Sequence, residues 1–585
     1  MRTFYETDMR RRILALSFVL VAWSAALALR LVQLQVKDHA RAKAAVLNQY
    51  QRNLTIEPER GDIYDRHGQI LACSLPAFSV YINPVDNETP AGEQRKISAL
   101  RSALGLTGRE TSVIQDRLRK QVSFTYVKKK VSKEDADRVR ALKLPGVGFE
   151  ATKKRHYPLR SLAAHVLGGV DLTEDNKAGV ERFYDSVLKG RDGKQVSYKD
   201  NRARSYQFQV IQPAVPGRDL VLTIDATIQY IVEKELAKAV SDHSAAWGTV
   251  IAMDPDSGEI LALASYPAYD VNAFPGPQNA WMNRAVQLSY EPGSTFKIVT
   301  AAAAREKGVV DYADVFDCRE GSITLGGLTI RDHVRMGILT FPEVLIESSN
   351  VGTVKFALGL SLEDFHAAIT GFGFGTKTGV DLPGEVNGRV FPVKDWNKRS
   401  SLPHIAIGYE LMATPLQILQ AMNTYATGGL AVRPRVVKNA PDLRPAPETG
   451  PDAARRVISE KTARELVKLA FEKTVEEGTG KAGRLDGYGI AGKTGTSQVY
   501  DPVLKTYTSK KYIASFVGFA PVGRPALTMV VVLAEPKEGF YYGGQVCAPV
   551  FRDIARQVLR YLRIPPEKPF EGRTMTADLK TGRRR

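Results

Sequence analysis

The longest apolar stretch of the chain lies at its N-terminus. Three arginines at 10–12 precede a run over 13–36 that carries a single charge, Arg30. A helix needs about 20 apolar residues to cross a bilayer, and an arginine near its end can reach the interface. The pattern predicts a transmembrane anchor over 13–36. Because the arginines precede it, we expect 1–12 in the cytoplasm and everything after the anchor outside the cytoplasmic (inner) membrane.

A cleavable signal peptide is the alternative interpretation of this stretch. The small residues Ala26-Leu27-Ala28 resemble a cleavage site. The apolar run is long for a signal peptide and continues past that point, so the sequence favours a retained, single-pass anchor.

Residues 37–220 alternate short β-like runs with charged helical stretches. The run 77–82 predicts a strand and 134–142 a polar helix. No cluster of catalytic residue types stands out here. We interpret this region as a spacer and docking domain and call it the pedestal.

The pattern changes after the turn-rich stretch 213–217, and a second domain is expected over 221–565. It begins with a predicted helix over 226–240 and a hairpin of strands over 248–253 and 259–264. Ala-rich helices then alternate with β runs such as 527–533. The fold class is therefore mixed α-β (α+β), and the basic segment 566–585 is expected to be a disordered tail.

Composition narrows the function classes. The chain has 585 residues, 44% hydrophobic and 25% charged, which is ordinary for folded protein. Its net charge of +18 favours anionic partners, yet no nucleic-acid-binding motif is present, so nucleic acid is not an expected partner. The three cysteines and eight histidines show no metal-ligand spacing. We expect neither a metal nor a cofactor.

The first candidate for chemistry is Ser294, followed three residues later by Lys297. A helical run is expected to open at Ser294, which places Lys297 on the same face. A serine hydroxyl needs a base to become a nucleophile, and a buried lysine can be that base when its pKa is lowered. The same spacing at Ser186 and Lys189 is interpreted as an exposed helix end.

Two further motifs accompany this pair. Ser348-Ser349-Asn350 follows about fifty residues later, and Lys493-Thr494-Gly495 lies near the end. This order of three motifs is the signature of penicillin-recognising acyltransferases. Lys-Thr-Gly also occurs at 377–379, in a glycine-rich loop, and at 580–582, in the tail. The copy at 493 is preferred because it follows a strand-like segment.

At these motifs the chain resembles the class B, monofunctional penicillin-binding proteins. Further matches lie at 60–68, 179–181, 222–225 with Gln229, 283–285, 515–518 and 542–544. The resemblance implies a serine β-lactamase-like transpeptidase domain, with helices on both sides of an antiparallel sheet, on an elongated α+β pedestal. The segment 290–293 and the short anchor look most like the septal, FtsI-like branch, with the elongation-specific branch as the alternative.

The resemblance also implies residue roles. Ser294 is the nucleophile, Lys297 its base, Ser348 a proton relay, and Asn350 orients the lysine and the substrate amide. The substrate carboxylate is bound by a second group of residues, Lys493, Thr494, Gly495 and Thr496. The backbone amides of Ser294 and Thr496 form the oxyanion hole. No role is assigned to Asp332 or His333, and Arg60, Asp65 and Arg66 are interpreted as structural ion-pair residues.

The implied activity is D-Ala-D-Ala transpeptidation of peptidoglycan stem peptides, with a possible carboxypeptidase side activity and with β-lactams as inhibitors. Family analogy adds a polytopic SEDS-type glycan polymerase and other membrane proteins of the division complex as partners. A β-lactamase or β-lactam sensor and a non-catalytic division scaffold stay open as alternatives. A β-lactamase needs a group that activates water, and no clear Glu-x-x-x-Asn segment follows Asn350.

Overall fold

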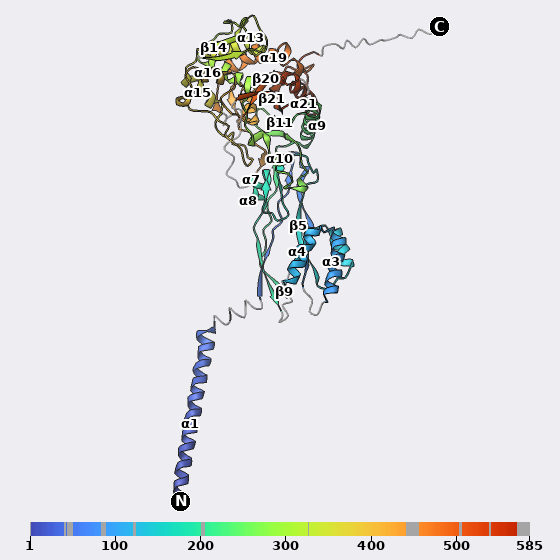
Figure 1. Ribbon diagram of the computed structural model, residues 1–585, viewed down its shortest axis with the longest axis vertical. Helices are drawn as coiled ribbons and strands as arrows, with labels where there is room; N and C mark the ends of the chain where they lie inside the picture. Colours follow the sequence, from blue (N-terminus) through green and yellow to red (C-terminus); the bar gives the residue numbers. More distant parts are fainter. Residues whose placement is uncertain are drawn as a thin grey trace, which may run out of the picture. The chain divides into compact units, whose positions relative to one another are not determined.

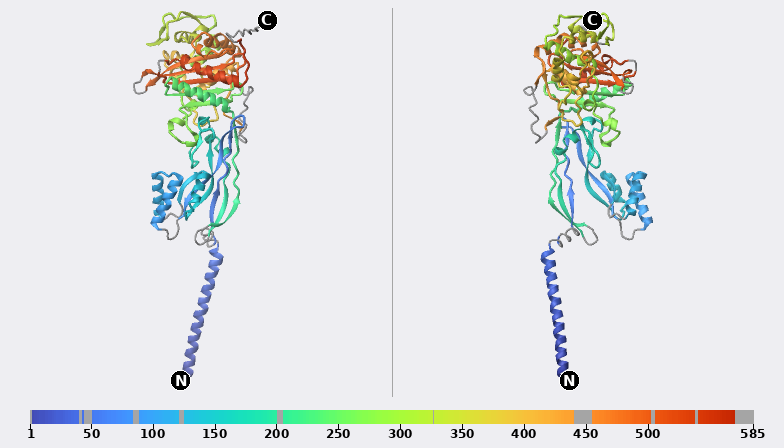
Figure 2. Two further views of the ribbon diagram at one scale, coloured as in Figure 1. Left: turned by 90° about the vertical axis from the view of Figure 1, so that its right-hand side faces the viewer. Right: turned by 60° about the vertical axis from the view of Figure 1, so that its left-hand side comes forward.

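The computed structural model describes residues 2–39, 43, 51–83, 89–120, 125–199, 205–325, 327–439, 455–501, 506–537 and 540–569. The chain divides into two compact units, one of 1–59 with 189–217 and one of 60–188 with 218–585. The stretch expected to form the pedestal thus contributes to both. Figures 1 and 2 show the elements coloured along the chain.

The first unit contains the N-terminal helix and a small sheet. Helix α1 (Arg2–Val32) continues into a short π-helix, η1 (Gln33–Lys37). The stretch Asp8–Lys37 is long and apolar enough to span a bilayer, as expected for the anchor over 13–36. The helix itself begins earlier than the apolar run. Strands β1 (Gln51–Ile56), β8 (Gly193–Lys199) and β9 (Ser205–Gln212) form a three-stranded antiparallel sheet.

The second unit begins with the rest of the pedestal. The expected strand at 77–82 lies in β3 (Ile70–Ile82) and the expected polar helix is α5 (Lys133–Ala141), so both predictions are confirmed. They pack with α3 (Pro90–Leu104), α4 (Gly108–Arg119) and β4 (Thr125–Val131) around a separate apolar cluster, while β5 (Val147–His156) pairs with β3. Helix α4 starts at a capping box, Thr107 with Glu110.

A mixed sheet joins the pedestal to the second domain. Strand β2 (Ile63–Tyr64) pairs with β3 on one side and, in parallel, with β10 (Leu220–Leu222) on the other. Strand β18 (Val437–Asn439) adds to β10. Gly61 precedes β2, and a Cβ atom there would lie 2.1 Å from the carbonyl oxygen of Arg218. The close approach of these two segments therefore requires glycine.

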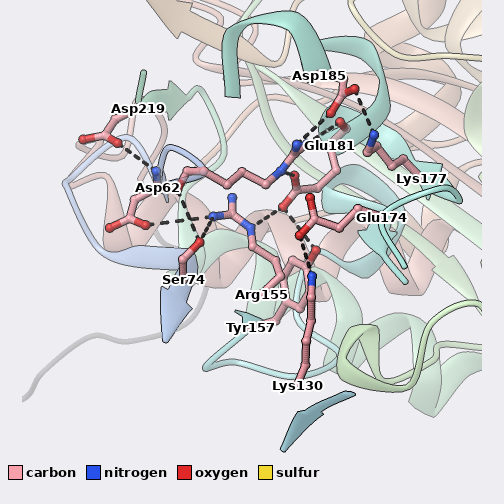
Figure 3. A network of polar contacts seen from close by, with 11 residues as sticks. Asp62, Ser74, Lys130, Arg155, Tyr157, Glu174, Lys177, Glu181, Asp185 and Asp219 are labelled. Carbon is pink, nitrogen blue, oxygen red and sulfur yellow. Dashed lines mark hydrogen bonds and ion pairs between the residues drawn. The ribbon is translucent and has the colours of Figure 1, made fainter. Parts of the chain in front are cut away.

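A buried ion network lies in the same region (Figure 3). Glu181, which is fully buried, accepts hydrogen bonds from Arg60 at 2.7 Å, Arg155 at 2.6 Å and the Tyr157 hydroxyl at 3.1 Å. Burial alone raises the pKa of Glu181, but the two guanidinium groups lower it overall. Arg60 and Glu181 lie in two of the segments that resemble the family, and they thus form one structural contact.

The centre of the second domain is a five-stranded antiparallel sheet in the order β12-β11-β22-β21-β20. Its strands are β11 (Trp247–Met253), β12 (Ile260–Tyr266), β20 (Ala491–Asp501), β21 (Thr506–Ala520) and β22 (Leu527–Ala534). The hairpin predicted over 248–264 and the strand predicted over 527–533 are confirmed. Strand β20 ends the sheet, so its outer edge has no partner among the described strands.

Helices cover both faces of this sheet (Figure 2). Helices α9 (Ala226–Asp242) and α21 (Ala548–Tyr561) share an apolar cluster with one face, and α12 (Lys297–Glu306) and α17 (Pro415–Ala426) share a larger cluster with the other. The side chain of Gln229 on α9 pairs with the backbone of Leu263 through two hydrogen bonds, at 2.9 and 2.8 Å. It holds the helix against β12.

The remaining elements surround this core. The described helices are α6 (Ala164–Leu167), α7 (Gly179–Phe183), α8 (Asp185–Leu188), α10 (Gln278–Trp281), α11 (Arg284–Gln287), α13 (Phe341–Ile346), α14 (Asn350–Ala357), α15 (Leu362–Gly371), α16 (Ser401–Ala406), α18 (Glu460–Leu466), α19 (Glu472–Glu476) and α20 (Gly543–Val546). The described short strands are β6 (Gly169–Val170), β7 (Lys177–Ala178), β13 (Val315–Asp317), β14 (Ser322–Leu325), β15 (Leu328–Arg331), β16 (Ile338–Thr340), β17 (Leu430–Ala431) and β19 (Arg455–Arg456).

The expected disordered tail over 566–585 needs a correction at its start. Glu567 accepts hydrogen bonds from the backbone N–H groups of Gly489, Val522 and Gly523, and Lys568 pairs with Glu472. These contacts attach Glu567 and Lys568 to the second domain, so the domain extends past Pro565. Residues 570–585 lie outside the described part of the chain.

Replacing Glu181 with alanine tests the buried network. It leaves two guanidinium groups buried without their carboxylate, and we expect the free energy of unfolding to fall by about 3–5 kcal/mol. Urea unfolding of the full chain in detergent measures it. In the control, Glu460→Ala removes an exposed ion pair with Arg464, and its effect should stay below about 1 kcal/mol. Equal losses in both variants would contradict the structural role of the network.

Candidate active site

Ser294 lies in η3 (Gly293–Phe296), a 3-10 turn that runs directly into α12. The sequence predicted a helix from Ser294. Its first turn is 3-10, as is common at the start of an α-helix, and this turn opens with Gly293, which has a φ of +58°. Gly293 also lies close to β20, since a Cβ atom on it would be 3.1 Å from the carbonyl oxygen of Thr496. The turn that carries the nucleophile candidate therefore lies beside the edge strand.

Lys297 is fully buried at the first position of α12. Its Nζ donates to the backbone carbonyl of Ser348 at 2.7 Å and to Asn350 Oδ1 at 2.8 Å, with Ser348 Oγ at 3.4 Å. Burial lowers the pKa of Lys297 to about 7, against a smaller raising effect of Asp332. A lysine with this pKa is partly neutral at pH 7 and can accept a proton.

Ser348 lies in the turn between α13 and α14, and Asn350 is the first residue of α14. Ser348 has a φ of +59°, an unfavourable conformation for a non-glycine residue. In this conformation its hydroxyl accepts a hydrogen bond from Lys493 Nζ at 2.8 Å while its carbonyl meets Lys297. The Asn350 side chain is fixed by a hydrogen bond from its amide to the carbonyl of Arg331 at 2.9 Å.

Lys493 is fully buried on β20, where the sequence predicted the third motif. Burial, together with the charge of Lys297, lowers its pKa well below the usual lysine value. Gly495 allows β20 to approach η3, because a Cβ atom there would lie 2.7 Å from Thr295 Cγ2 and 2.4 Å from Ser515 Oγ.

Two threonines flank this glycine on β20. The Thr494 hydroxyl lies 2.9 Å from that of Thr479, and the Thr496 hydroxyl accepts a hydrogen bond from the backbone N–H of Gly543 at 3.1 Å.

The structure brings all three motifs together, with Ser348 Oγ between the two lysines.

Asp332 has no assigned role in the sequence analysis, yet it supports the second motif. It follows the β14–β15 hairpin and accepts hydrogen bonds from the Ser349 hydroxyl at 2.9 Å and from the backbone N–H groups of Asn350 and Val351. These N–H groups begin helix α14, where a carboxylate is favoured. No local pattern reveals this, because the contact joins residues 17 to 19 positions apart. His333 lies beside Tyr542, with ring centroids 6.1 Å apart.

The competing motif copies lie elsewhere. Thr378 donates to the Glu385 carboxylate, and Gly379 accepts from Arg433, so this copy stabilises a loop. Ser186 and Lys189 are exposed. The copy at 580–582 lies outside the described residues.

The three pedestal residues singled out from the sequence make structural contacts. Arg60 belongs to the buried network and Arg66 pairs with Glu259 at 3.2 Å. Asp65 accepts hydrogen bonds from the backbone N–H groups of Gln69 and Ala226.

Comparisons with known proteins identify the family of the chain. Residues 248–556 match the penicillin binding protein transpeptidase domain, and residues 55–222 match the penicillin-binding protein dimerisation domain. The chain belongs to the class B penicillin-binding proteins and is a serine-type peptidoglycan D,D-transpeptidase by family.

Individual relatives are similar over most of their length. The chain is 33% identical to the probable peptidoglycan D,D-transpeptidase PenA of Neisseria meningitidis, covering 95% of this chain and 94% of that protein. It is 32% identical to the peptidoglycan D,D-transpeptidase FtsI of Escherichia coli, covering 88% and 85%. Penicillin binding protein 3 of Mycobacterium tuberculosis, solved with aztreonam, superposes with a TM-score of 0.68 at 28% identity, covering 88% and 99%.

The Asp332→Asn variant tests the support of the second motif. Loosening the turn displaces Ser348 and Asn350. A misplacement of a reacting group by about 1 Å can lower the reaction rate by a factor of roughly 100. We expect Ser294 acylation by a penicillin to slow about 10- to 100-fold. Because Asp332 raises the pKa of Lys297, its loss should also move the rising limb of the pH profile to lower pH.

The matched control is Asp317→Asn, which removes a carboxylate paired with the exposed Arg319. It should leave the rate and the pH profile unchanged. A rate within twofold of wild type for Asp332→Asn, with an unmoved pH limb, would show that Asp332 does not position the turn.

Proposed function

We propose that the chain cross-links peptidoglycan stem peptides through an acyl-enzyme on Ser294, in septal wall synthesis during cell division. The observation that carries the catalytic assignment is the contact of both buried lysines with one hydroxyl, that of Ser348, beside the turn that holds Ser294. The septal assignment rests on the likeness to FtsI, and elongation-specific wall synthesis is its alternative.

In the acylation step, Ser294 Oγ attacks the carbonyl carbon of the penultimate D-Ala. The new O–C bond forms as the C–N bond to the terminal D-Ala breaks. Lys297 takes the serine proton, and Ser348, which touches both lysines, passes a proton to the departing amine. The backbone N–H groups of Ser294 and Thr496 stabilise the negative charge that develops on the carbonyl oxygen. Each such donor lowers the free energy of the transition state by about 3 kcal/mol.

Lys493, Thr494 and Thr496 bind the terminal carboxylate of the donor. Burial and the neighbouring Lys297 disfavour the ammonium form of Lys493, and a carboxylate next to it favours that form. Asn350, fixed between Arg331 and Lys297, orients both the lysine and the substrate amide. An amine of a second stem peptide then attacks the acyl carbon and releases Ser294, and a penicillin acylates the same serine in place of the donor.

We further place α1 in the cytoplasmic membrane as a single-pass anchor, with the catalytic domain outside. Its apolar stretch spans a bilayer by length, and the arginines at 10–12 set the orientation. A helix anchored in this way can contact a polytopic glycan polymerase of the SEDS type and other membrane proteins of the division complex.

Covalent labelling tests the nucleophile. The full chain in detergent is incubated with a fluorescent penicillin, and intact mass is followed over time. We expect a stable adduct on the wild type and none on Ser294→Ala, while Ser186→Ala, with an exposed hydroxyl, labels as wild type does. Rapid loss of the label would indicate a β-lactamase. A folded wild type that takes no label would favour the non-catalytic scaffold.

The pH dependence of acylation tests the base. At saturating penicillin, the acylation rate constant should rise with pH, because raising the pH removes the proton from Lys297. The rising limb should lie at or below about 7, where burial places the pKa of Lys297, and far below the usual lysine value of about 10.4. Stopped-flow labelling between pH 5 and 9 measures it. A rate that is flat over this range would exclude Lys297 as the titrating base.

A further inference from the structure

Glu410 lies close to the nucleophile turn in a backbone conformation that glutamate rarely adopts. Its φ is +57°, in the left-handed region. This conformation is unfavourable for a residue with a Cβ atom, and it persists only where the surrounding contacts hold it. Residues in such conformations concentrate at functional sites. The contacts that hold Glu410 therefore indicate what its turn does.

The side chain of Glu410 is attached to helix α16. One carboxylate oxygen accepts a hydrogen bond from the Ser401 hydroxyl at 2.6 Å, and the other lies 2.6 Å from Nδ1 of His404. Because an ionised carboxylate has no proton to donate, Nδ1 carries the proton of this contact. The hydrogen bond with His404 lowers the pKa of Glu410, so the carboxylate is charged at neutral pH. Two short, charge-assisted hydrogen bonds thus hold this side chain on one helix.

The turn that contains Glu410 contacts the residue before the nucleophile. The carbonyl of Gly408 accepts a hydrogen bond from the backbone N–H of Gly293 at 3.1 Å. The two backbones pack so closely that a Cβ atom on Gly408 would lie 2.1 Å from the carbonyl oxygen of Gly293. Because close-packed groups transmit displacements, a shift of the turn moves Gly293 and with it Ser294.

Two further contacts join the same segments. The backbone N–H of Glu410 donates to the Glu291 carboxylate at 3.0 Å, and Tyr290 and Ala413 exchange two backbone hydrogen bonds of 2.9 Å. Residues 408–413 therefore run beside residues 290–293, the segment that leads into the nucleophile. The carboxylate of Glu410 connects this pair of segments to α16.

We propose that Glu410 is a positioning residue for Ser294. Its carboxylate, held by Ser401 and His404, stabilises the left-handed turn, and this turn fixes Gly293 and so the nucleophile. In this role the glutamate acts through the backbone rather than on the substrate. The inference rests on the proposed function, in which Ser294 is the nucleophile, and it adds a residue that serves the acylation step.

The Glu410→Gly variant separates positioning from stability. Glycine adopts a φ of +57° without a steric cost, so the variant relieves the backbone while it removes both contacts with α16. These two effects on stability oppose each other, and we expect an unfolding midpoint within about 2 °C of the wild type. Because the turn is no longer attached, acylation of Ser294 should slow about tenfold.

The experiment measures the second-order rate constant with which a fluorescent penicillin labels the full chain in detergent. This constant comes from the time course, so it does not depend on the fraction of protein that is folded. The matched control is Glu174→Gly. Glu174 also has a left-handed conformation, with a φ of +62°, and its carboxylate pairs with Lys130 at 2.7 Å in the pedestal. The rate constant of this variant should stay within about twofold of the wild type.

A double-mutant cycle tests whether the effect passes through the contact with His404. His404→Leu removes the donor to Glu410, so it should slow acylation of the wild type but cause no further loss in Glu410→Gly. His404→Asn places an amide N–H near the position of Nδ1 and should restore most of the rate. A general loss of packing at His404 would instead slow both backgrounds equally.

Wild-type acylation by Glu410→Gly, or an equal effect of His404→Leu in both backgrounds, would overturn the inference and leave the transpeptidase function intact. A Glu174→Gly variant that slows as much as Glu410→Gly would overturn it as well. A folded wild type that takes no label would instead reject the proposed function itself, and the inference with it.

Discussion

The proposed mechanism depends on two buried lysines that share one hydroxyl group. Taking an ammonium group out of water costs several kcal/mol, and two of them close together repel. The site contains Lys297 and Lys493, both fully buried and both within hydrogen-bond reach of Ser348 Oγ. The two lysines therefore cannot both be in the ammonium form at neutral pH without an anion beside them. Burial therefore supplies a base where an exposed lysine would stay protonated.

The fold keeps these groups in place with segments that are far apart in sequence. Strand β20 carries Lys493 at the end of the sheet, and Gly495 lets that strand approach the turn of Ser294. The left-handed conformation of Ser348 presents its carbonyl to one lysine and its hydroxyl to the other. Asp332 stabilises the start of α14 and so fixes the turn that Ser348 occupies.

The three motifs could be predicted from the sequence, whereas the residues that hold them in place could not. Periodicity predicted the β11–β12 hairpin, β22 and α9, because alternation and helical spacing are local signals. The three motifs were readable because their residue types and order are specific. Asp332 was missed, since an aspartate after a hairpin is common and its partners lie in another element.

The shared hydroxyl also explains how a substrate could prepare the base. In the structure the stronger acceptors, the Ser348 carbonyl and Asn350 Oδ1, contact Lys297, whereas Lys493 donates to a hydroxyl and, at 3.3 Å, to the carbonyl of Thr494. These contacts favour a proton on Lys297 over one on Lys493. A donor carboxylate beside Lys493 reverses this preference, because it stabilises the proton on Lys493. Charge on Lys493 then disfavours charge on Lys297, and Ser348 Oγ offers a path between them. Binding of the group to be cleaved would thus leave Lys297 neutral when Ser294 must lose its proton.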